Sequence, residues 1–145
     1  MEWKQEAMEK LRRYNTMRVA SENLSAEIEM LRDASTDLQS GANYGPKVRG
    51  GGYNREEELI NNLVMRQELE WTLKQVRQWL AITDRGLAVL TPEERLVLQR
   101  LYLLPEKGAV DTLCTELRVE QATVYRKRDR AIRRFTMALY GISEM

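Results

Sequence analysis

Apolar residues recur at helical spacing along most of the chain. Residues 3–39 contain neither proline nor glycine, and their apolar positions fall close to the a/d pattern of a heptad repeat. These positions are Tyr14, Met17, Leu24, Ile28, Leu31 and Leu38. The pattern predicts one long amphipathic helix over residues 3–39.

A second stretch, from Arg55 to about Thr83, repeats this helical spacing. Its apolar positions are Leu59, Leu63, Leu69, Leu73, Val76 and Leu80, with Trp71 and Trp79. The two stretches are separated by residues 40–54, where several glycines and one proline break the helical pattern. We therefore expect residues 1–86 to form an antiparallel helical hairpin with a glycine-rich loop at 40–54.

After Gly86 the pattern changes from long helices to short ones. Thr91 suits the N-cap of a helix, Pro92 its first position and Glu94 the third residue after the cap. Leu96, Leu98, Leu101 and Leu104 continue this helix to Pro105. A second short helix is expected over residues 110–117, with Val110, Leu113, Cys114 and Leu117 on one face.

Residues 118–134 hold most of the positive charge of the chain. They contain seven basic residues and two acidic ones, a net charge of +5, whereas the whole chain sums to +1. The remainder must therefore sum to about −4. A basic stripe confined to one helix is the electrostatic footprint of a protein that binds a polyanion, most commonly nucleic acid.

The basic helix is expected to begin near Gln121 and to run to about Tyr140, where Gly141 ends it. At about 100° per residue its two faces differ. Val124, Ala131 and Phe135 share one face, and Ala122, Arg126, Asp129, Arg130 and Arg133 share the other. A short helix, a three-residue turn at 118–120 and a longer basic helix describe a helix-turn-helix over residues 87–145, whose second helix enters the major groove.

The first residues of such a recognition helix approach the base edges. The candidates for base reading are Gln121, Ala122, Thr123, Tyr125 and Arg126. Arg126 suits guanine, Gln121 suits adenine, and the Ala122 methyl suits the thymine methyl. The candidates for phosphate binding are Arg118, Lys127, Arg130, Arg133 and Arg134.

The last fifty-five or so residues resemble region 4 of sigma-70-type factors. The similarity lies in Leu90–Arg95, in Leu101 and Tyr102, and in residues 119–135 with their Ala-Ile-Arg-Arg-Phe ending. With the long helix and glycine-rich break before them, they look like the small sigma-like transcriptional regulators of Firmicutes prophages, of the RinA and ArpU type. The resemblance implies an all-α protein that regulates transcription in the cytoplasm.

The chain departs from this family where bases are read. Region 4 commonly has glycine and then serine in the turn and an Arg-Glu pair opening the recognition helix, whereas this chain has Arg118, Glu120, Gln121 and Ala122. A standard −35 promoter preference is therefore not carried over. The chain also shows no region 2, so it is not expected to act as a complete sigma factor.

Composition argues against an enzyme. The chain has no histidine and one cysteine, Cys114, which excludes zinc chemistry and histidine-dependent triads. The glycine-rich segment lacks the Gly-Lys-Ser/Thr ending of a P-loop, and no apolar run resembles a signal sequence or a membrane span. We expect no catalytic residue, metal or cofactor, and a cytoplasmic protein.

The expected partner is double-stranded DNA, and no membrane is involved. Two other functions are left open: a small-terminase-like DNA-recognition subunit of phage packaging, and an interaction module that binds RNA polymerase. The N-terminal heptads are compatible with the core of an intramolecular hairpin and with a homodimer seam, so a second copy of the chain stays open as a partner.

Overall fold

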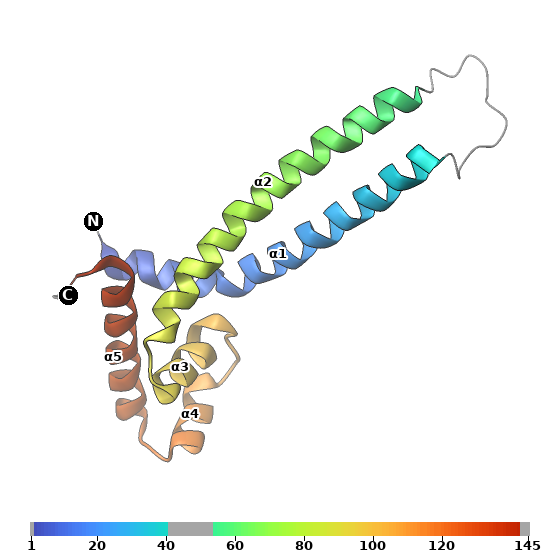
Figure 1. Cartoon of the computed structure of the whole chain (residues 1–145). Coiled ribbons are helices and arrows are strands. Elements are labelled where there is room, and N and C mark those ends of the chain that lie inside the picture. The colour runs from blue at the N-terminus through green and yellow to red at the C-terminus, as the bar shows by residue number, and fades with distance from the viewer. Residues whose placement is uncertain (1, 41–53, 143–145) are drawn as a thin grey trace. The chain divides into compact units, whose positions relative to one another are not determined.

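The computed structural model describes residues 2–40 and 54–142. All regular elements in these two ranges are helices, in the order α1, α2, α3, η1, α4 and α5 (Figure 1). No strand occurs in the described ranges. The predicted all-α class is confirmed.

Two long helices come first. The first, α1, spans Trp3–Ser40 and matches its predicted bounds within a residue. The second, α2, spans Arg55–Ala88, five residues beyond the predicted end at Thr83. Beyond the predicted end α2 still packs on unit 1, because Thr83 is fully buried and Leu87 lies in the core. The interior of the predicted loop at 40–54 lies outside the described residues.

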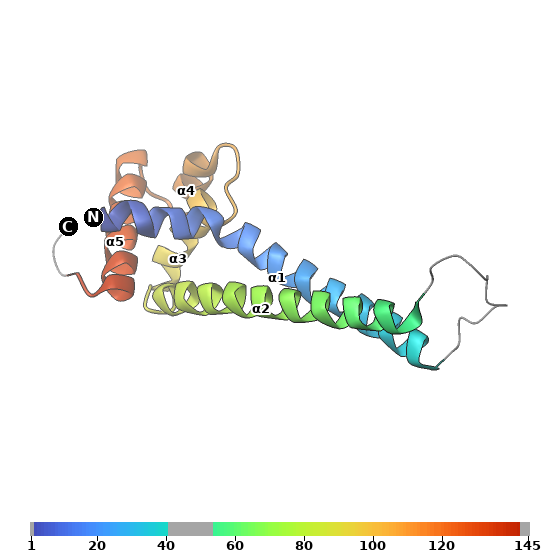
Figure 2. The same cartoon turned by 90° about the horizontal axis from the view of Figure 1, so that it is seen from above.

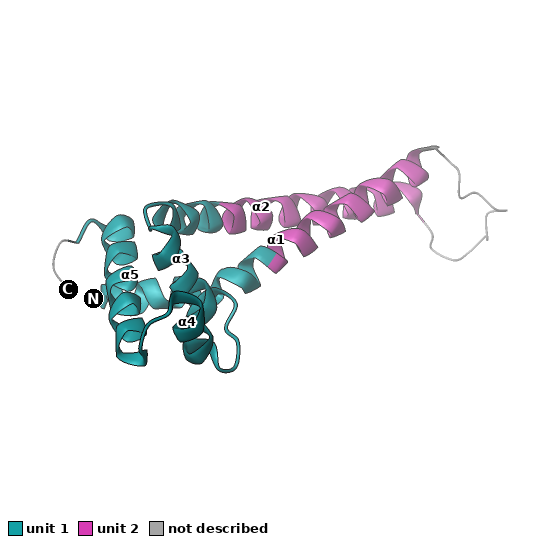
Figure 3. Cartoon of the chain, turned by 90° about the horizontal axis from the view of Figure 1, so that it is seen from below, with its two compact units in different colours: residues 1–18, 78–145 teal, residues 19–77 magenta. Residues whose placement is uncertain are grey.

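The chain divides into two compact units, coloured separately in Figure 3. Unit 1 comprises residues 1–18 and 78–145, and unit 2 comprises residues 19–77. Both boundaries fall inside the long helices, whereas the sequence had suggested a boundary at 86–87. The contacts group the ends of α1 and α2 with the C-terminal helices because apolar residues of those ends complete the core of unit 1.

The core of unit 1 joins helices that are distant in sequence. Its buried residues are Ala7, Leu11, Leu87, Leu90, Leu98, Leu103, Ala131, Ile132 and Phe135. The first turns of α1 lie beside the C-terminal end of α5, which spans Gln121–Tyr140 (Figures 1 and 2). There the rings of Trp3 and Tyr140 are 4.7 Å apart between centroids. Burial of this apolar surface is the main stabilising contribution to unit 1.

Two further contacts fix α2 in unit 1. The Tyr14 hydroxyl donates to Asp84 Oδ1 at 2.5 Å, and burial, followed by this hydrogen bond and the Asp84 charge, raises the pKa of Tyr14 to about 12. At Gly86 the helices approach so closely that a Cβ atom would lie 2.8 Å from Phe135 Cε1. A glycine is required at this position by the neighbouring ring.

The next helix, α3, spans Pro92–Leu98 and begins as predicted. The Glu94 amide donates to Thr91 Oγ1 at 3.2 Å, and the Thr91 amide donates to Glu94 Oε1 at 2.9 Å. This is the expected capping box.

The helix that begins at Pro92 does not continue to Pro105 as an α-helix, although the sequence had predicted that it would. After Leu98 the chain forms one π-helical turn, η1, over Gln99–Leu103, closed by the Leu104 amide donating to the Gln99 carbonyl oxygen at 2.9 Å. Leu103 is buried in the core, whereas Leu104, predicted on the apolar face, is 45% exposed. The wider turn changes which of these two leucines packs inward.

In unit 2, segments of α1 and α2 pair in antiparallel directions and lie side by side (Figures 2 and 3). The Arg55 guanidinium donates to the carbonyl oxygens of Leu38 and Gln39. Further along, Asn62 Nδ2 donates to the Leu31 carbonyl oxygen at 2.7 Å. The buried residues of this pairing are Ile28, Ser35, Asn62, Leu73 and Val76. Unit 2 therefore encloses few side chains.

Candidate nucleic-acid interface

The basic segment, residues 118–134, follows helix α4 and lies on the turn after it and on α5. Helix α4 spans Ala109–Leu117, and three residues separate it from α5. Arg118 ends α4 in the left-handed conformation, with φ 56°, and its amide and that of Val119 both donate to the Cys114 carbonyl oxygen. This geometry is common at helix ends, although glycine usually occupies it. The predicted turn at 118–120 and the helix end at Gly141, with φ 68°, are confirmed.

The inner face of α5 is fully enclosed. Val124, Ala131 and Phe135 have no exposed surface, as the two-face pattern predicted. Val124 packs in a cluster with Leu113 of α4 and Val97 of α3. Leu117 at the end of α4 and Val119 in the turn pack against this cluster and are partly buried. The cluster around Val124 and the core around Phe135 together hold α5 in one orientation within unit 1.

The outer face of α5 is exposed and mostly basic. The exposed residues include the predicted set of Ala122, Arg126, Asp129, Arg130 and Arg133. Because the inner face is packed along its length, these side chains extend away from the core of unit 1. The helix therefore presents a charged surface that a partner can approach without disturbing the fold.

Four of the five predicted base-reading residues lie in this exposed surface. Gln121, Ala122, Tyr125 and Arg126 are exposed, whereas Thr123 is half-buried. Gln121 Nε2 lies 3.5 Å from the Tyr125 hydroxyl oxygen, and Arg126 Nε donates to the Ala122 carbonyl oxygen at 3.4 Å. Both contacts are long, so these side chains can rotate towards a ligand at small energetic cost.

The helical pattern predicted no contact at this surface for Arg128. Its guanidinium carbon lies 5.0 Å from the Tyr125 ring centroid, within the range of a cation–π contact, and its Nη2 lies 2.8 Å from Asp129 Oδ1. Residues three apart on a helix are neighbours, so the spacing of Tyr125 and Arg128 could have predicted this contact. Arg128 therefore orients the ring of Tyr125, which is itself one of the predicted base-reading residues.

The five predicted phosphate-binding residues fall into two groups. Lys127 Nζ lies 2.5 Å from Glu93 Oε1, and Arg134 Nη1 lies 3.2 Å from Glu94 Oε1. Among the described residues, no acidic side chain lies within ion-pair distance of Arg118, Arg130 or Arg133, and all three are exposed. The charges of Arg118, Arg130 and Arg133 are therefore not neutralised by an ion pair among the described residues.

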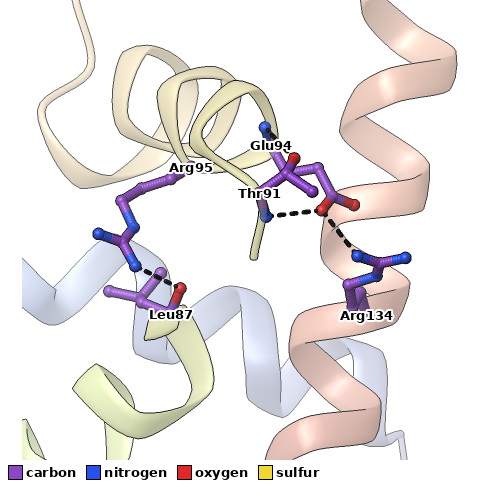
Figure 4. Close-up of polar contacts among 5 residues, drawn as sticks. All are labelled: Leu87, Thr91, Glu94, Arg95 and Arg134. Atoms are coloured by element: carbon purple, nitrogen blue, oxygen red, sulfur yellow. Dashed lines mark hydrogen bonds and ion pairs between the residues drawn. The ribbon is translucent and has the colours of Figure 1, made fainter. Parts of the chain in front are cut away.

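Glu94 of the α3 capping box links α3 to Arg134 of α5 (Figure 4). Glu94 Oε1 accepts both from the Thr91 amide and from Arg134, while its Oε2 is buried without a hydrogen-bond partner among the described residues. A hollow of about 210 Å³ lies here, lined by Thr91, Glu93, Glu94, Lys127, Arg130 and Arg134. The glutamates that begin α3 thus neutralise part of the basic helix.

The described residues contain no group of three histidine, cysteine, aspartate or glutamate side chains that could hold a metal ion. Cys114 is a half-buried free thiol packed against the Val97–Leu113–Val124 cluster. Burial, with the nearby Glu6 charge, raises the pKa of Tyr140, whose ring packs on Trp3. None of the described helices is both long and apolar enough to cross a membrane.

Comparisons with protein-family models, with curated proteins and with solved structures find no match to this chain.

Proposed function

We propose that this chain is a sequence-specific transcriptional regulator that binds duplex DNA. In this proposal α4, the turn at 118–120 and α5 form a helix-turn-helix, and α5 enters the major groove. The observation that carries the proposal is the division of α5 into a fully buried apolar face and an exposed basic face. The paired segments of α1 and α2 in unit 2 serve for assembly or for contact with polymerase.

The N-terminal end of α5 supplies the base-reading residues of the proposal. Arg126 leaves the Ala122 carbonyl oxygen and donates two hydrogen bonds to O6 and N7 of a guanine. Gln121 pairs with an adenine, and the exposed Ala122 methyl contacts a thymine methyl. Tyr125, held by Arg128, packs against the sugar-phosphate edge of the groove.

Phosphate binding in the proposal rests first on Arg118, Arg130 and Arg133. They are exposed and have no acidic partner among the described residues, so their binding to phosphate requires no internal ion pair to break. Lys127 and Arg134 contribute less, since each must exchange a glutamate of α3 for a phosphate oxygen. Their ion pairs also keep the basic face partly neutral in the absence of DNA.

The resemblance of the last fifty-five or so residues to sigma region 4 supports the same docking mode. It rests on the Thr91–Glu94 helix start and on the Ala-Ile-Arg-Arg-Phe ending of the basic helix. Within that ending, Ala131, Ile132 and Phe135 are buried and Arg133 and Arg134 are exposed. The shared residues thus include both packing residues and cations.

Selection of bound sequences from a random duplex pool at physiological salt tests the proposal. We expect a defined consensus for the wild-type chain. Arg126→Ala should relax the preference at one base pair, while Arg133→Ala should weaken binding to all sequences alike. Arg13→Ala is the matched control, because it removes one exposed positive charge from α1 and should leave both properties unchanged.

Three results would redirect the proposal. Equal losses on every sequence from Arg126→Ala and Arg133→Ala would remove base reading by Arg126. Absence of DNA binding, with capture of RNA polymerase by the purified chain, would favour the interaction module instead. A large closed ring in light scattering, together with DNA binding, would favour the packaging subunit.

A further inference from the structure

Helix α2 carries two separate heptad stripes within unit 2. The inner stripe consists of Leu59, Asn62, Arg66, Leu69, Leu73 and Val76. It faces α1, because Asn62 bonds the Leu31 carbonyl oxygen and both Leu73 and Val76 are buried. These contacts within one chain use the inner stripe completely.

The outer stripe consists of Glu57, Ile60, Val64, Gln67, Trp71 and Lys74, all exposed. Its residues alternate spacings of three and four, which is the spacing of a seam between two packed helices. Ile60 is 60% exposed, Val64 47% and Trp71 66%. A helix that has only water on its outer side carries polar residues there, so this stripe indicates a protein partner.

The positions of the outer stripe are symmetric about its centre. About the midpoint between Met65 and Arg66, Glu57 mirrors Lys74, Ile60 mirrors Trp71, and Val64 mirrors Gln67. Two copies related by a two-fold axis through this midpoint would place opposite charges together at both ends, the apolar Ile60 against Trp71 inside them, and Val64 against Gln67 at the centre. Such self-complementarity is the requirement of a symmetric dimer interface.

We infer that the outer stripe of α2 binds the outer stripe of a second copy of this chain, with the two helices antiparallel. Each Glu57 carboxylate then pairs with Lys74 of the second copy, and each Trp71 ring covers Ile60 of the second copy. A hollow of about 450 Å³ lined by Val64, Gln67, Glu68, Trp71 and Thr72 lies opposite Leu63 and Val64 of the second copy. Leu63 is itself 46% exposed and widens the apolar contact.

Charge selects the antiparallel arrangement over the parallel one. Parallel helices would place Glu57 against Glu57 and Lys74 against Lys74, so both ends of the contact would repel. On the exposed side of α1 the described part of unit 2 has two large apolar residues, Val19 and Met30, whereas the outer stripe of α2 has three. The inference concerns unit 2 alone and does not rest on DNA binding.

The mass of the full-length chain in solution tests the inference. We expect sedimentation equilibrium between about 1 and 100 μM to show a monomer–dimer equilibrium. Ile60→Glu and Trp71→Glu should each raise the dimer dissociation constant at least about tenfold, since each buries a carboxylate in the seam. Met30→Glu is the matched control: Met30 is 70% exposed but lies on α1 outside the stripe, so its dissociation constant should not change.

Charge exchange tests the direction of the helices. Glu57→Lys and Lys74→Glu should each weaken the dimer, and the double exchange should restore it, because both pairs are then reversed together. Glu57 and Lys74 of the same chain cannot pair with each other, because they lie seventeen positions apart on the helix, a distance of about 26 Å. Circular dichroism of each variant, with unchanged helix content, shows that the fold is intact.

Several outcomes would overturn the inference. A monomer at every concentration would leave the stripe to a different protein, and a dimer indifferent to Ile60→Glu and Trp71→Glu would use another surface. Failure of the double exchange to restore the dimer would exclude the antiparallel seam. DNA affinity measured on the same variants separates this inference from the proposed function, because loss of the dimer leaves the α5 surface of each chain intact.

Discussion

The outer faces of α5 and α2 differ although the two helices are built by the same rule. Each packs one face against neighbouring helices of its own unit and exposes the other. On α5 the exposed face carries Arg126, Arg130 and Arg133, whereas on α2 it carries Ile60 and Trp71. A basic face suits a polyanion and an apolar face suits another protein. The two exposed faces therefore indicate two different classes of partner.

The inner faces differ as well. Phe135 in unit 1 has no exposed surface, because helices from both ends of the chain surround it. In unit 2 only two helical segments meet, and its buried described residues are Ile28, Ser35, Asn62, Leu73 and Val76, two of them polar. Unit 1 is thus a closed core that supports a rigid interface, while unit 2 leaves apolar surface uncovered.

Truncation of a core residue should have the largest effect. Phe135→Ala removes a fully buried ring from unit 1 and should lower the free energy of unfolding by about 3–5 kcal/mol. Met30→Ala in unit 2 should change it by less than about 0.5 kcal/mol, since Met30 is 70% exposed. Urea denaturation of both variants measures the difference. Similar losses from the two would contradict the burial of Phe135 in the core of unit 1.

A smaller loss is expected at the contact of α2 with α5. Alanine normally stabilises a helix relative to glycine by about 1 kcal/mol. Gly86→Ala should instead destabilise unit 1 by about 1–3 kcal/mol, because the added Cβ would lie 2.8 Å from Phe135 Cε1. Thermal unfolding measures the change, and Ala138→Gly at an exposed position of α5 reports the propensity effect alone. A stabilised Gly86→Ala variant would show that α2 and α5 are not in close contact.

The Tyr14–Asp84 contact should contribute about 1 kcal/mol to unit 1 at pH 7. Because folding raises the pKa of Tyr14 from 10.0 to about 12, this contribution is complete below pH 10 and is lost as the pH rises through 12. Denaturation of the wild type and Tyr14→Phe should therefore differ at pH 7 and converge towards pH 12. A difference between the wild type and Tyr14→Phe that stays constant across this pH range would rule out the contact.

The smallest effect concerns the basic face itself. Glu93→Gln releases Lys127 from its ion pair and should strengthen binding to random duplex DNA several-fold at low salt. The free energy of unfolding should change by less than about 1 kcal/mol, because the pair is partly exposed. Glu106→Gln removes the same charge from an exposed position away from α5 and serves as the control. Equal gains from both variants would attribute the effect to net charge alone.

Local signals in the sequence predicted much of the fold. The capping box at Thr91–Glu94, the helix end at Gly141 and the two faces of α5 depend on neighbouring residues and on helical periodicity, and all three are present. The unit boundaries were not predicted, because the helical pattern of α1 and α2 continues without interruption across residues 18–19 and 77–78. The π-helical turn η1 likewise carries no local signal.

The sequence predicted which face of α5 is exposed, but not the contacts that the cations of this face make. The ion pairs of Lys127 with Glu93 and of Arg134 with Glu94 join positions 34 and 40 residues apart. They depend on the packing of α3 against α5, which periodicity does not define. The division of the cations into paired and unpaired groups therefore required the structure.

The salt dependence of DNA binding tests the central claim most directly. Fluorescence anisotropy of a labelled duplex should give an affinity that falls linearly, in logarithmic terms, with salt concentration, with a slope of about −0.9 for each phosphate neutralised. Replacement of both Arg130 and Arg133 by alanine should make this slope less negative by about 1.8. No binding at low salt, or a slope unchanged in the double variant, would contradict the assignment of the outer face of α5 to DNA.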